Sequence, residues 1–367
     1  MRERVNGMGE SVNGRMGIRC PTDAPLRNHR PLRITGEGHM TRRLAWLIAL
    51  ALVPTLAAQQ SASKPAAPEI AFDSVADPLK LPADMNLGEV AGVAVNSKGH
   101  IFIYDRAART RLLEFDHAGT FVREIGKDLY GFYQAHVVRI DKDDNIWCVD
   151  EGTNTVIKFN PAGHVQMVLG RKWELVDGPP AQPSPNGPPP RARDNYFNRP
   201  TDVAWDAAGN IFVSDGYNNS RVAKFDKNGA WIKTWGERGN APGQFNTPHT
   251  IATDAAGQVY VGDRANRRIQ VFTGDGAFVK QFGDIGQPWA ICITPPPTQV
   301  LFSSDADSGR IFKLGLDGTL LGWFGSFGKQ LKQFGWIHEI ACPSDHELYV
   351  GELLNWRMQK LLIQPGH

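Results

Sequence analysis

The chain lacks the short motifs that mark several common enzyme classes. Its 367 residues contain no P-loop, no GxSxG nucleophile elbow and no HExxH zinc helix. Several turns carry Asp and Gly without the DxDxDG spacing of a calcium-binding EF-hand loop, and side-chain-to-backbone turn chemistry accounts for them. These turns contain Asp116, Asp226, Asp254, Asp275 and Asp317.

Cysteine is scarce, with four residues in the whole chain. Cys20 lies in an Arg-rich leader, whereas Cys148, Cys292 and Cys342 lie in apolar segments (IWCVD, AICIT and IACPS). Three is an odd number, so the sequence predicts buried free thiols rather than a disulfide framework. Cys292 and Cys342 could nevertheless approach each other if their segments are neighbours in the fold.

Long apolar runs are also rare. Leu44 to Leu56 is one, preceded by Arg42 and Arg43 and followed by small residues. This pattern predicts a signal peptide over residues 40–58, which is short for a membrane span. We expect Met40 to be the true start, residues 1–39 to be a non-native upstream extension and residues 59–69 to be a linker. A retained membrane anchor and twin-arginine export are alternatives; the expected location is periplasmic or secreted.

The chain has no strong excess of either charge. Residues 1–58 hold nine arginines and four acidic residues, so the remainder carries a formal net charge of −3, against +2 for the full sequence. No basic patch indicates nucleic acid as a partner. We expect a monomer without a stable membrane span.

A repeated unit of several short strands fills the rest of the chain. Aligning its second strand recovers six copies: GHIFIYD (99–105), DNIWCVD (144–150), GNIFVSD (209–215), GQVYVGD (257–263), TQVLFSSD (298–305) and HELYVGE (346–352). A period of roughly 40–50 residues is typical of a β-propeller. The sequence therefore predicts an all-β fold, a six-bladed β-propeller over residues 70–367. Residues 171–195 form a Pro-rich insertion, and residues 70–87 are expected to supply an outer strand that closes the ring against the last blade.

Histidine recurs at one position of this repeat. The residue at the start of the innermost strand is, in blade order, Ala91, His136, Thr201, His249, Trp289 and His338. Alternate blades of a six-fold ring are related by about a third of a turn, so the three imidazoles can converge on the axis. This arrangement predicts a three-histidine zinc site with a position left for water or substrate. Packing in the core is the alternative role for each histidine.

The turn after the second strand brings further polar residues to the same end of the ring. Arg106, Arg264 and Tyr217 follow that strand in blades one, four and three. Guanidinium groups bind carboxylates bidentately, and a tyrosine beside a metal can act as a base. These residues predict a site for an anionic substrate; salt bridges between blades and packing of the tyrosine are the alternatives.

Three segments resemble a known family. They are FNRPTDVAWDAAGNIFVSDGYNNSRVAKF (197–225), PGQFNTPHTIA (242–252) and GDRANRRIQVF (262–272). They look like NHL-repeat propellers and, more narrowly, like the catalytic domain of peptidyl-α-hydroxyglycine α-amidating lyase. The resemblance implies zinc on His136, His249 and His338, a catalytic Tyr217, and site arginines Arg106 and Arg264. It also implies a structural calcium, whose ligands here would be Val90, Val138 and Glu339.

The sequence departs from the family pattern around its third histidine. Trp336 and Ile337 replace the expected Met-Pro, and Glu339 replaces Asp, which puts calcium in doubt. Asn218 stands where a disulfide cysteine is expected, and no monooxygenase domain is attached.

The expected function is that of an exported zinc-dependent lyase. It would cleave the C–N bond of a small peptide ending in α-hydroxyglycine, giving a peptide amide and glyoxylate. The alternatives are a non-catalytic NHL propeller that binds a peptide, glycan or protein, and another metal-assisted reaction such as lactone hydrolysis.

Overall fold

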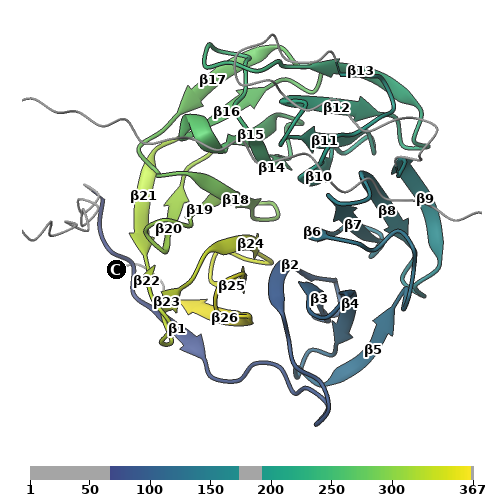
Figure 1. The fold of residues 1–367 in the computed structure, drawn as a ribbon. Coiled ribbons are helices and arrows are strands. Elements are labelled where there is room, and N and C mark those ends of the chain that lie inside the picture. The colour runs from purple at the N-terminus through teal and green to yellow at the C-terminus, as the bar shows by residue number, and fades with distance from the viewer. Residues whose placement is uncertain (1–66, 173–191, 365–367) are drawn as a thin grey trace, which may run out of the picture. The chain divides into compact units, whose positions relative to one another are not determined.

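The computed structural model of the protein describes residues 67–172 and 192–364. Within these ranges the chain forms six four-stranded sheets around a central axis, which confirms the predicted six-bladed propeller (Figure 1). The predicted upstream extension, the signal peptide, most of the linker and most of the 171–195 insertion lie outside the described residues. No helix in the described part of the chain is long and apolar enough to cross a membrane.

Each blade is an antiparallel sheet whose first strand lies closest to the axis (Figure 1). The strands of blades one to three are β2 (Glu89–Val95), β3 (Ile101–Arg106), β4 (Thr110–Phe115) and β5 (Phe121–Ile125); β6 (Ala135–Ile140), β7 (Ile146–Asp150), β8 (Thr155–Phe159) and β9 (Val165–Gly170); and β10 (Asp202–Trp205), β11 (Ile211–Asp215), β12 (Arg221–Phe225) and β13 (Trp231–Trp235).

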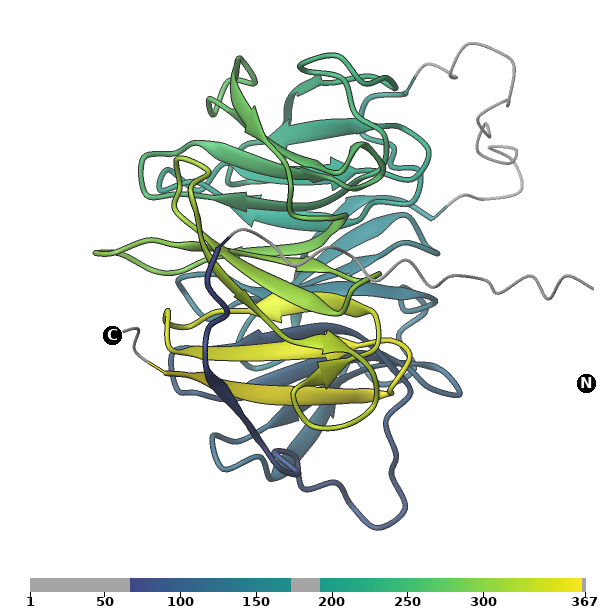
Figure 2. The ribbon, with the colours of Figure 1, turned by 90° about the vertical axis from the view of Figure 1, so that its left-hand side faces the viewer.

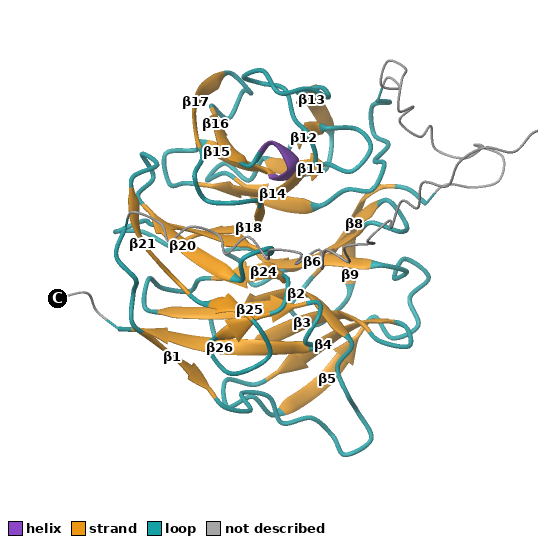
Figure 3. Ribbon diagram, turned by 60° about the vertical axis from the view of Figure 1, so that its left-hand side comes forward, coloured by secondary structure: helices purple, strands orange, loops and turns teal. Residues whose placement is uncertain are grey.

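Blades four to six continue the same pattern. Their strands are β14 (Pro248–Thr253), β15 (Val259–Asp263), β16 (Arg268–Phe272) and β17 (Phe278–Phe282); β18 (Pro288–Ile293), β19 (Leu301–Asp305), β20 (Arg310–Leu314) and β21 (Leu320–Phe324); and β24 (Ile337–Ala341), β25 (Glu347–Glu352), β26 (Arg357–Ile363) and β1 (Phe72–Val75). A parallel pair, β22 (Ser326–Phe327) with β23 (Gln333–Phe334), joins blades five and six. A 3-10 turn, η2 (Arg264–Asn266), follows β15 (Figure 3).

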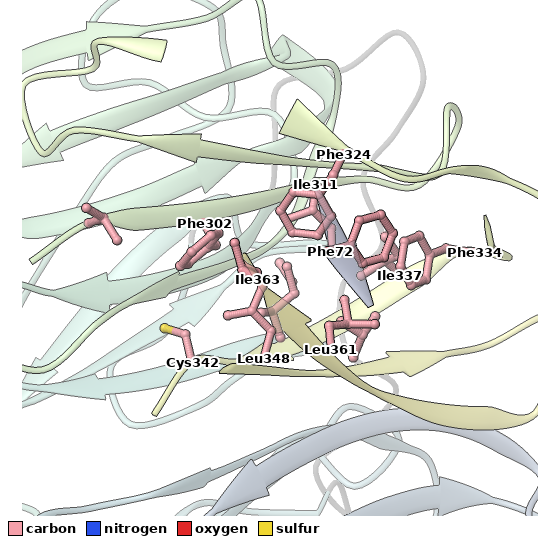
Figure 4. Packing of buried hydrophobic residues seen from close by; sticks show 14 residues of the cluster. Phe72, Phe302, Ile311, Phe324, Phe334, Ile337, Cys342, Leu348, Leu361 and Ile363 are labelled. Atoms are coloured by element: carbon pink, nitrogen blue, oxygen red, sulfur yellow. The ribbon is translucent and has the colours of Figure 1, made fainter. Parts of the chain in front are cut away.

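The two ends of the propeller meet in blade six. Strand β1 comes from the N-terminal side and pairs antiparallel with β26, placing Phe72 opposite Ile363 (Figure 2). Phe72 then packs on Phe324 with ring centroids 4.8 Å apart, inside a core shared with Phe334 and Leu361 (Figure 4). The predicted outer closing strand is therefore confirmed, and apolar burial seals the joint.

The acidic residue that ends the second strand of each blade has a structural role. Its carboxylate accepts a hydrogen bond from a backbone N–H 16–18 residues earlier, in the loop that leads into the innermost strand. The pairs are Gly88 with Asp105, Gln134 with Asp150, Asn198 with Asp215, Asn246 with Asp263, Gln287 with Asp305, and Gly335 with Glu352. These contacts fix where each innermost strand begins, and so they position the residues that face the axis.

The prediction of three free thiols is wrong. Cys292 in β18 and Cys342, just after β24, form a disulfide, and only Cys148 is a free, buried thiol among the described residues. The two sulfurs meet because the innermost strands of blades five and six are neighbours, which brings the Cα atoms to 6.0 Å. The three cysteines after the leader are an odd number because Cys148 stays unpaired beside the one disulfide.

Candidate metal centre and surrounding site

A backbone irregularity turns each histidine toward the axis. The pairing of the first and second strands shifts register at His136 in β6, at His249 in β14 and at His338 in β24. The same shift occurs at Ala91 in β2, and β18 has one across Trp289 and Ala290. A β-bulge redirects the side chain at its extra residue. The repeat position identified in the sequence is therefore the position at which the strand bends.

The three imidazoles gather at one point. Their ring centroids lie 4.7 Å apart for His136 and His249, 4.6 Å for His136 and His338, and 5.1 Å for His249 and His338. One nitrogen from each ring lies within 4.8 Å of the other two, and all three residues are buried. The structure thus brings together the histidines that the repeat pattern predicted.

Two of the rings are held in a defined tautomer. Nδ1 of His249 lies 2.6 Å from the carbonyl oxygen of Trp289, and Nδ1 of His338 lies 2.7 Å from that of Ala91. A carbonyl only accepts, so each Nδ1 carries the hydrogen and each Nε2 keeps its lone pair. Carbonyl partners of this kind orient metal-ligating histidines in proteins.

The surroundings keep the imidazoles neutral. Burial lowers the pKa of all three, and the neighbouring imidazoles and arginines strengthen the effect. The pKa of His338 falls to about 3, mainly through burial and then through Arg106. Neutral imidazole is the form that binds metal. Nδ1 of His136 is buried without a hydrogen-bond partner among the described residues. These donors fit a zinc ion, which takes three protein ligands at catalytic sites.

Tyr217 completes the centre. Its hydroxyl lies 3.3 Å from Nε2 of His136 and 3.2 Å from Nε2 of His249. Burial and then Glu151 raise the pKa of Tyr217, whereas Arg264, Arg106 and other nearby guanidinium groups lower it. The phenol therefore reaches the point on which the imidazoles converge, as the sequence predicted.

Arg264 is a cation without an acidic partner in the described part of the chain. Within residues 67–172 and 192–364, no carboxylate lies within ion-pair distance of its guanidinium, which rests on the rings of Tyr217 at 5.4 Å and Trp289 at 4.6 Å. Stacking on aromatic faces holds an arginine in place and leaves its N–H groups available. This arginine can bind a carboxylate brought in by a ligand.

Arg106 is engaged differently. Its Nε donates to the carbonyl oxygen of Ala135 at 2.7 Å, and its terminal nitrogens lie 3.2 Å from Glu151 and 3.4 Å from Glu89. The inter-blade salt bridge considered from the sequence is therefore present. Glu151 is buried and also pairs with Arg199 at 2.9 Å. Arg106 lies near the centre, but its guanidinium is hydrogen-bonded to other groups of the protein.

Sequence reasoning gave no role to several residues around the centre. Glu151 occupies the same turn position as Arg106 and Arg264. That shared position could have indicated that Glu151 also lies near the centre. Arg199, whose guanidinium lies 4.3 Å from the Tyr217 ring centroid, precedes an innermost strand and had no such signal. Trp336 is 40% exposed and packs against Trp289 with centroids 5.5 Å apart and ring planes tilted by 37°. The two indoles form an aromatic wall beside His249 and His338.

Of the residues assigned to calcium, Glu339 is already paired with a cation. Val90 and Val138 are buried in β2 and β6, and Glu339 is buried in β24 directly after His338. Oε1 of Glu339 lies 3.0 Å from Nη1 of Arg139, so a guanidinium already neutralises the expected calcium carboxylate. Calcium stays an untested prediction, and no chemistry is assigned to it here.

A separate cavity of about 850 Å³ lies at the far ends of the innermost strands. It is lined by residues such as Ile140, Trp205, Thr253 and Ile293, which end β6, β10, β14 and β18. The histidines lie at the starts of their strands, so this cavity is at the opposite end of the innermost strands and contributes nothing to the metal centre.

Comparison with known proteins agrees with this architecture. The NHL repeat model matches residues 197–225 and 245–272, in blades three and four. The solved structure of virginiamycin B lyase from Staphylococcus aureus superposes with a TM-score of 0.56 and 13% identity, over 81% of this chain and 100% of that one. At this identity the likeness shows the fold alone. The protein is an NHL-repeat six-bladed β-propeller.

Its sequence relatives are more specific. It is distantly related to peptidyl-glycine alpha-amidating monooxygenase A of Xenopus laevis, with 29% identity over 73% of this chain and 31% of the relative. It is also related to peptidyl-alpha-hydroxyglycine alpha-amidating lyase 1 of Drosophila melanogaster, with 27% identity over 76% of this chain and 58% of the relative. The chain therefore spans less than two thirds of either protein.

Proposed function

We propose that the protein is an exported, zinc-dependent lyase acting on peptides that end in α-hydroxyglycine. The reaction would release a peptide amide and glyoxylate. The observation that carries the proposal is the position of Tyr217. Its hydroxyl bridges two of three converging imidazoles, and its ring supports an arginine that has no acidic partner among the described residues. The named relatives supply the reaction class.

The metal would be held by Nε2 of His249 and His338 together with the His136 ring. Zinc bound there would supply Lewis acidity at the substrate oxygen. The chain's own residues keep these ligands neutral and correctly oriented, through burial and through the carbonyls of Trp289 and Ala91.

Tyr217 and Arg264 would perform the remaining steps. Arg264 binds the carboxylate of the terminal α-hydroxyglycine and aims its hydroxyl at the centre. The positive charge of a bound metal and of Arg264 would favour the deprotonated form of Tyr217 against the effect of burial. In that form Tyr217 accepts the hydroxyl proton while the C–O bond becomes a carbonyl and the C–N bond breaks. The bonding electrons pass to nitrogen, which takes the proton back from Tyr217 and leaves as the peptide amide. No proton is gained or lost overall.

Arg106 would act from a distance by keeping the centre electropositive and holding Ala135, the residue before His136. The aromatic wall of Trp289 and Trp336 would carry the part of the peptide that precedes the hydroxyglycine. Export is supported by the Cys292–Cys342 disulfide, because such bonds persist in oxidising compartments. Calcium is left out of the mechanism.

The first test is metal content followed by turnover. Protein purified from residue 59 onward should contain about one zinc per chain, and His249→Ala should lose it. The zinc-loaded protein should then release glyoxylate from a short peptide ending in α-hydroxyglycine. Tyr217→Phe should lower kcat by about 100- to 10,000-fold, the range for loss of a general base. Arg264→Ala should lower kcat/KM by about 10- to 150-fold, the value of a charged hydrogen bond.

Tyr260→Phe is the matched control for Tyr217→Phe. Tyr260 is also a buried tyrosine with a hydrogen-bonded hydroxyl, 3.1 Å from Asp254, but that contact lies beyond the end of β14 opposite to His249. Its variant should retain wild-type turnover. If the zinc-loaded protein releases no glyoxylate, or if Tyr217→Phe and Arg264→Ala both turn over normally, the lyase proposal fails. The non-catalytic propeller would then take its place.

A further inference from the structure

Arg139 lies among the innermost strands of the propeller, where its guanidinium contacts oxygen atoms from three other blades. It lies three residues after His136 in β6, with 14% of its side chain exposed. Nε and Nη2 grip Asp202 at 2.9 and 2.6 Å, and Nη2 also reaches the carbonyl oxygen of Ile291 at 3.2 Å. Nη1 reaches Glu339 at 3.0 Å and the carbonyl oxygen of Ile340 at 3.4 Å. All three nitrogens of the guanidinium therefore lie within hydrogen-bond or ion-pair distance of oxygen atoms.

This cluster joins five of the six blades. Arg139 belongs to blade two, Asp202 to blade three, Ile291 to blade five and Glu339 to blade six. Blade four enters through Thr250, whose hydroxyl donates to Asp202 at 2.8 Å and accepts from the Ile291 N–H at 3.0 Å. One cation thus binds the innermost strands together where they are closest.

The same cluster borders all three histidines. Thr250 directly follows His249, and Glu339 directly follows His338, while Arg139 shares the short strand β6 with His136. A shift of the guanidinium would be felt in every strand that carries an imidazole. Removal of a group that orients the metal-binding side chains without touching the metal typically lowers metal affinity by about 10- to 100-fold.

A bound calcium could in principle do the same work, because calcium also gathers carboxylates and backbone carbonyls. Here those oxygens are already used: Asp202 and Glu339 supply carboxylates to Arg139, and Ile291 and Ile340 supply carbonyls. A divalent ion on the same carboxylates would face a positive neighbour. Oε2 of Glu339 is the one carboxylate oxygen of the cluster without a partner in the described structure.

We propose that Arg139 is a built-in cation that takes the place of a structural calcium and positions the three histidine strands. Arg139 is a positioning residue and touches no substrate. The proposal concerns metal binding and stability and does not depend on the lyase reaction.

The test measures three quantities without substrate. They are the calcium content after dialysis against calcium, the Tm in EGTA and in about 5 mM calcium, and the zinc affinity by competition with a chelator. Wild type should bind no calcium and show the same Tm in both buffers. Arg139→Ala exposes an oxygen-lined gap with two carboxylates, so it should lose about 10 °C in Tm and regain part of it in calcium. Its zinc affinity should fall about 10- to 100-fold.

The control is Arg221→Ala. Arg221 is also buried in an ion pair, 2.9 Å from Asp215, but it begins β12, the third strand of its blade, away from the axis. It should lose stability without a calcium response and with zinc affinity unchanged. Arg139→Lys keeps the positive charge but loses the planar guanidinium that binds two oxygens at once. This variant should fold and show an intermediate loss of zinc affinity.

Several outcomes would overturn the proposal. One calcium bound per wild-type chain, or a wild-type Tm that drops in EGTA, would show that Arg139 does not replace the ion. Wild-type zinc affinity in both Arg139→Lys and Arg139→Ala would remove its positioning role. The wild-type calcium measurements decide the first part even if Arg139→Ala fails to fold.

Discussion

The metal-free protein should lose stability as the pH falls, and part of that loss should disappear in His338→Gln. The pKa of His338 in the folded state is about 3, because burial and then Arg106 disfavour the imidazolium. In the unfolded chain a histidine has a pKa of about 6.5. The unfolded state therefore takes up a proton that the folded state does not. The contribution is fully present above about pH 6.5 and is lost progressively toward pH 3.

The expected size follows from these two values. Between pH 7.5 and 5.5, protonation of unfolded His338 should lower the free energy of unfolding by about 1.4 kcal/mol, and the full loss near pH 3 should reach about 5 kcal/mol. The pKa values of His136 and His249 are lowered in the same direction. Their losses add to that of His338. The contribution of His338 alone is already a noticeable part of the roughly 5–15 kcal/mol that stabilises a typical domain.

Urea unfolding in EDTA at pH 7.5, 6.5 and 5.5 would measure this effect. Wild type and His338→Gln share every other titrating group, so the difference between their pH dependences reports His338 together with its effect on the two neighbouring imidazoles. Glutamine can still donate to the carbonyl oxygen of Ala91 in place of Nδ1. The variant should lose about 1.4 kcal/mol less than wild type over this range. His346→Gln, at an exposed position, should behave as wild type. Equal pH dependence in His338→Gln and wild type would refute the reasoning.

Further predictions concern the disulfide and the substrate site. Replacing Cys292 and Cys342 together with serine should lower the free energy of unfolding by about 4 kcal/mol, because the disulfide closes a loop spanning 50 residues. Urea unfolding measures this loss, with Cys148→Ala as the comparison that leaves the disulfide intact. An unchanged urea midpoint in the double serine variant would contradict the prediction. Trp336→Ala should raise KM by about two- to tenfold for peptides with an apolar residue before the hydroxyglycine, and equal effects on peptides with glycine there would argue against the aromatic wall. Arg264→Lys keeps the charge but loses bidentate binding, so kcat/KM should fall about tenfold; a value as low as that of Arg264→Ala would indicate that geometry matters more than charge.

The sequence predicted the part of the site that follows the repeat. His136, His249 and His338 share one repeat position, and symmetry converts that shared position into a meeting point on the axis. Tyr217 and Arg264 follow from another shared position, the turn after the second strand. The six blades and the closing strand near Phe72 follow from the same periodicity of short apolar strands.

Contacts between unlike positions could not be predicted in this way. Arg139 meets Asp202 and Glu339 only because the innermost strands of several blades converge, and the repeat gives these residues no common position. The Cys292–Cys342 bond depends on the same proximity, and the leftover Cys148 hid it. The partners of Glu151 likewise come from blades one and three, far away in the sequence.

The shared last blade has a consequence for how the protein folds. Phe72 and Ile363 are about 290 residues apart in the chain, yet they sit opposite each other in one sheet. Because this pairing joins residues far apart in the sequence, the native contact order is high. The entropic cost of closing such a long loop can be offset only after the final strand is available, so ring closure should come late. The three histidine-bearing blades can hold their spacing only in a closed ring. Zinc uptake would therefore report the last event of folding, and a chain truncated at either end should bind the metal poorly even if its separate blades form.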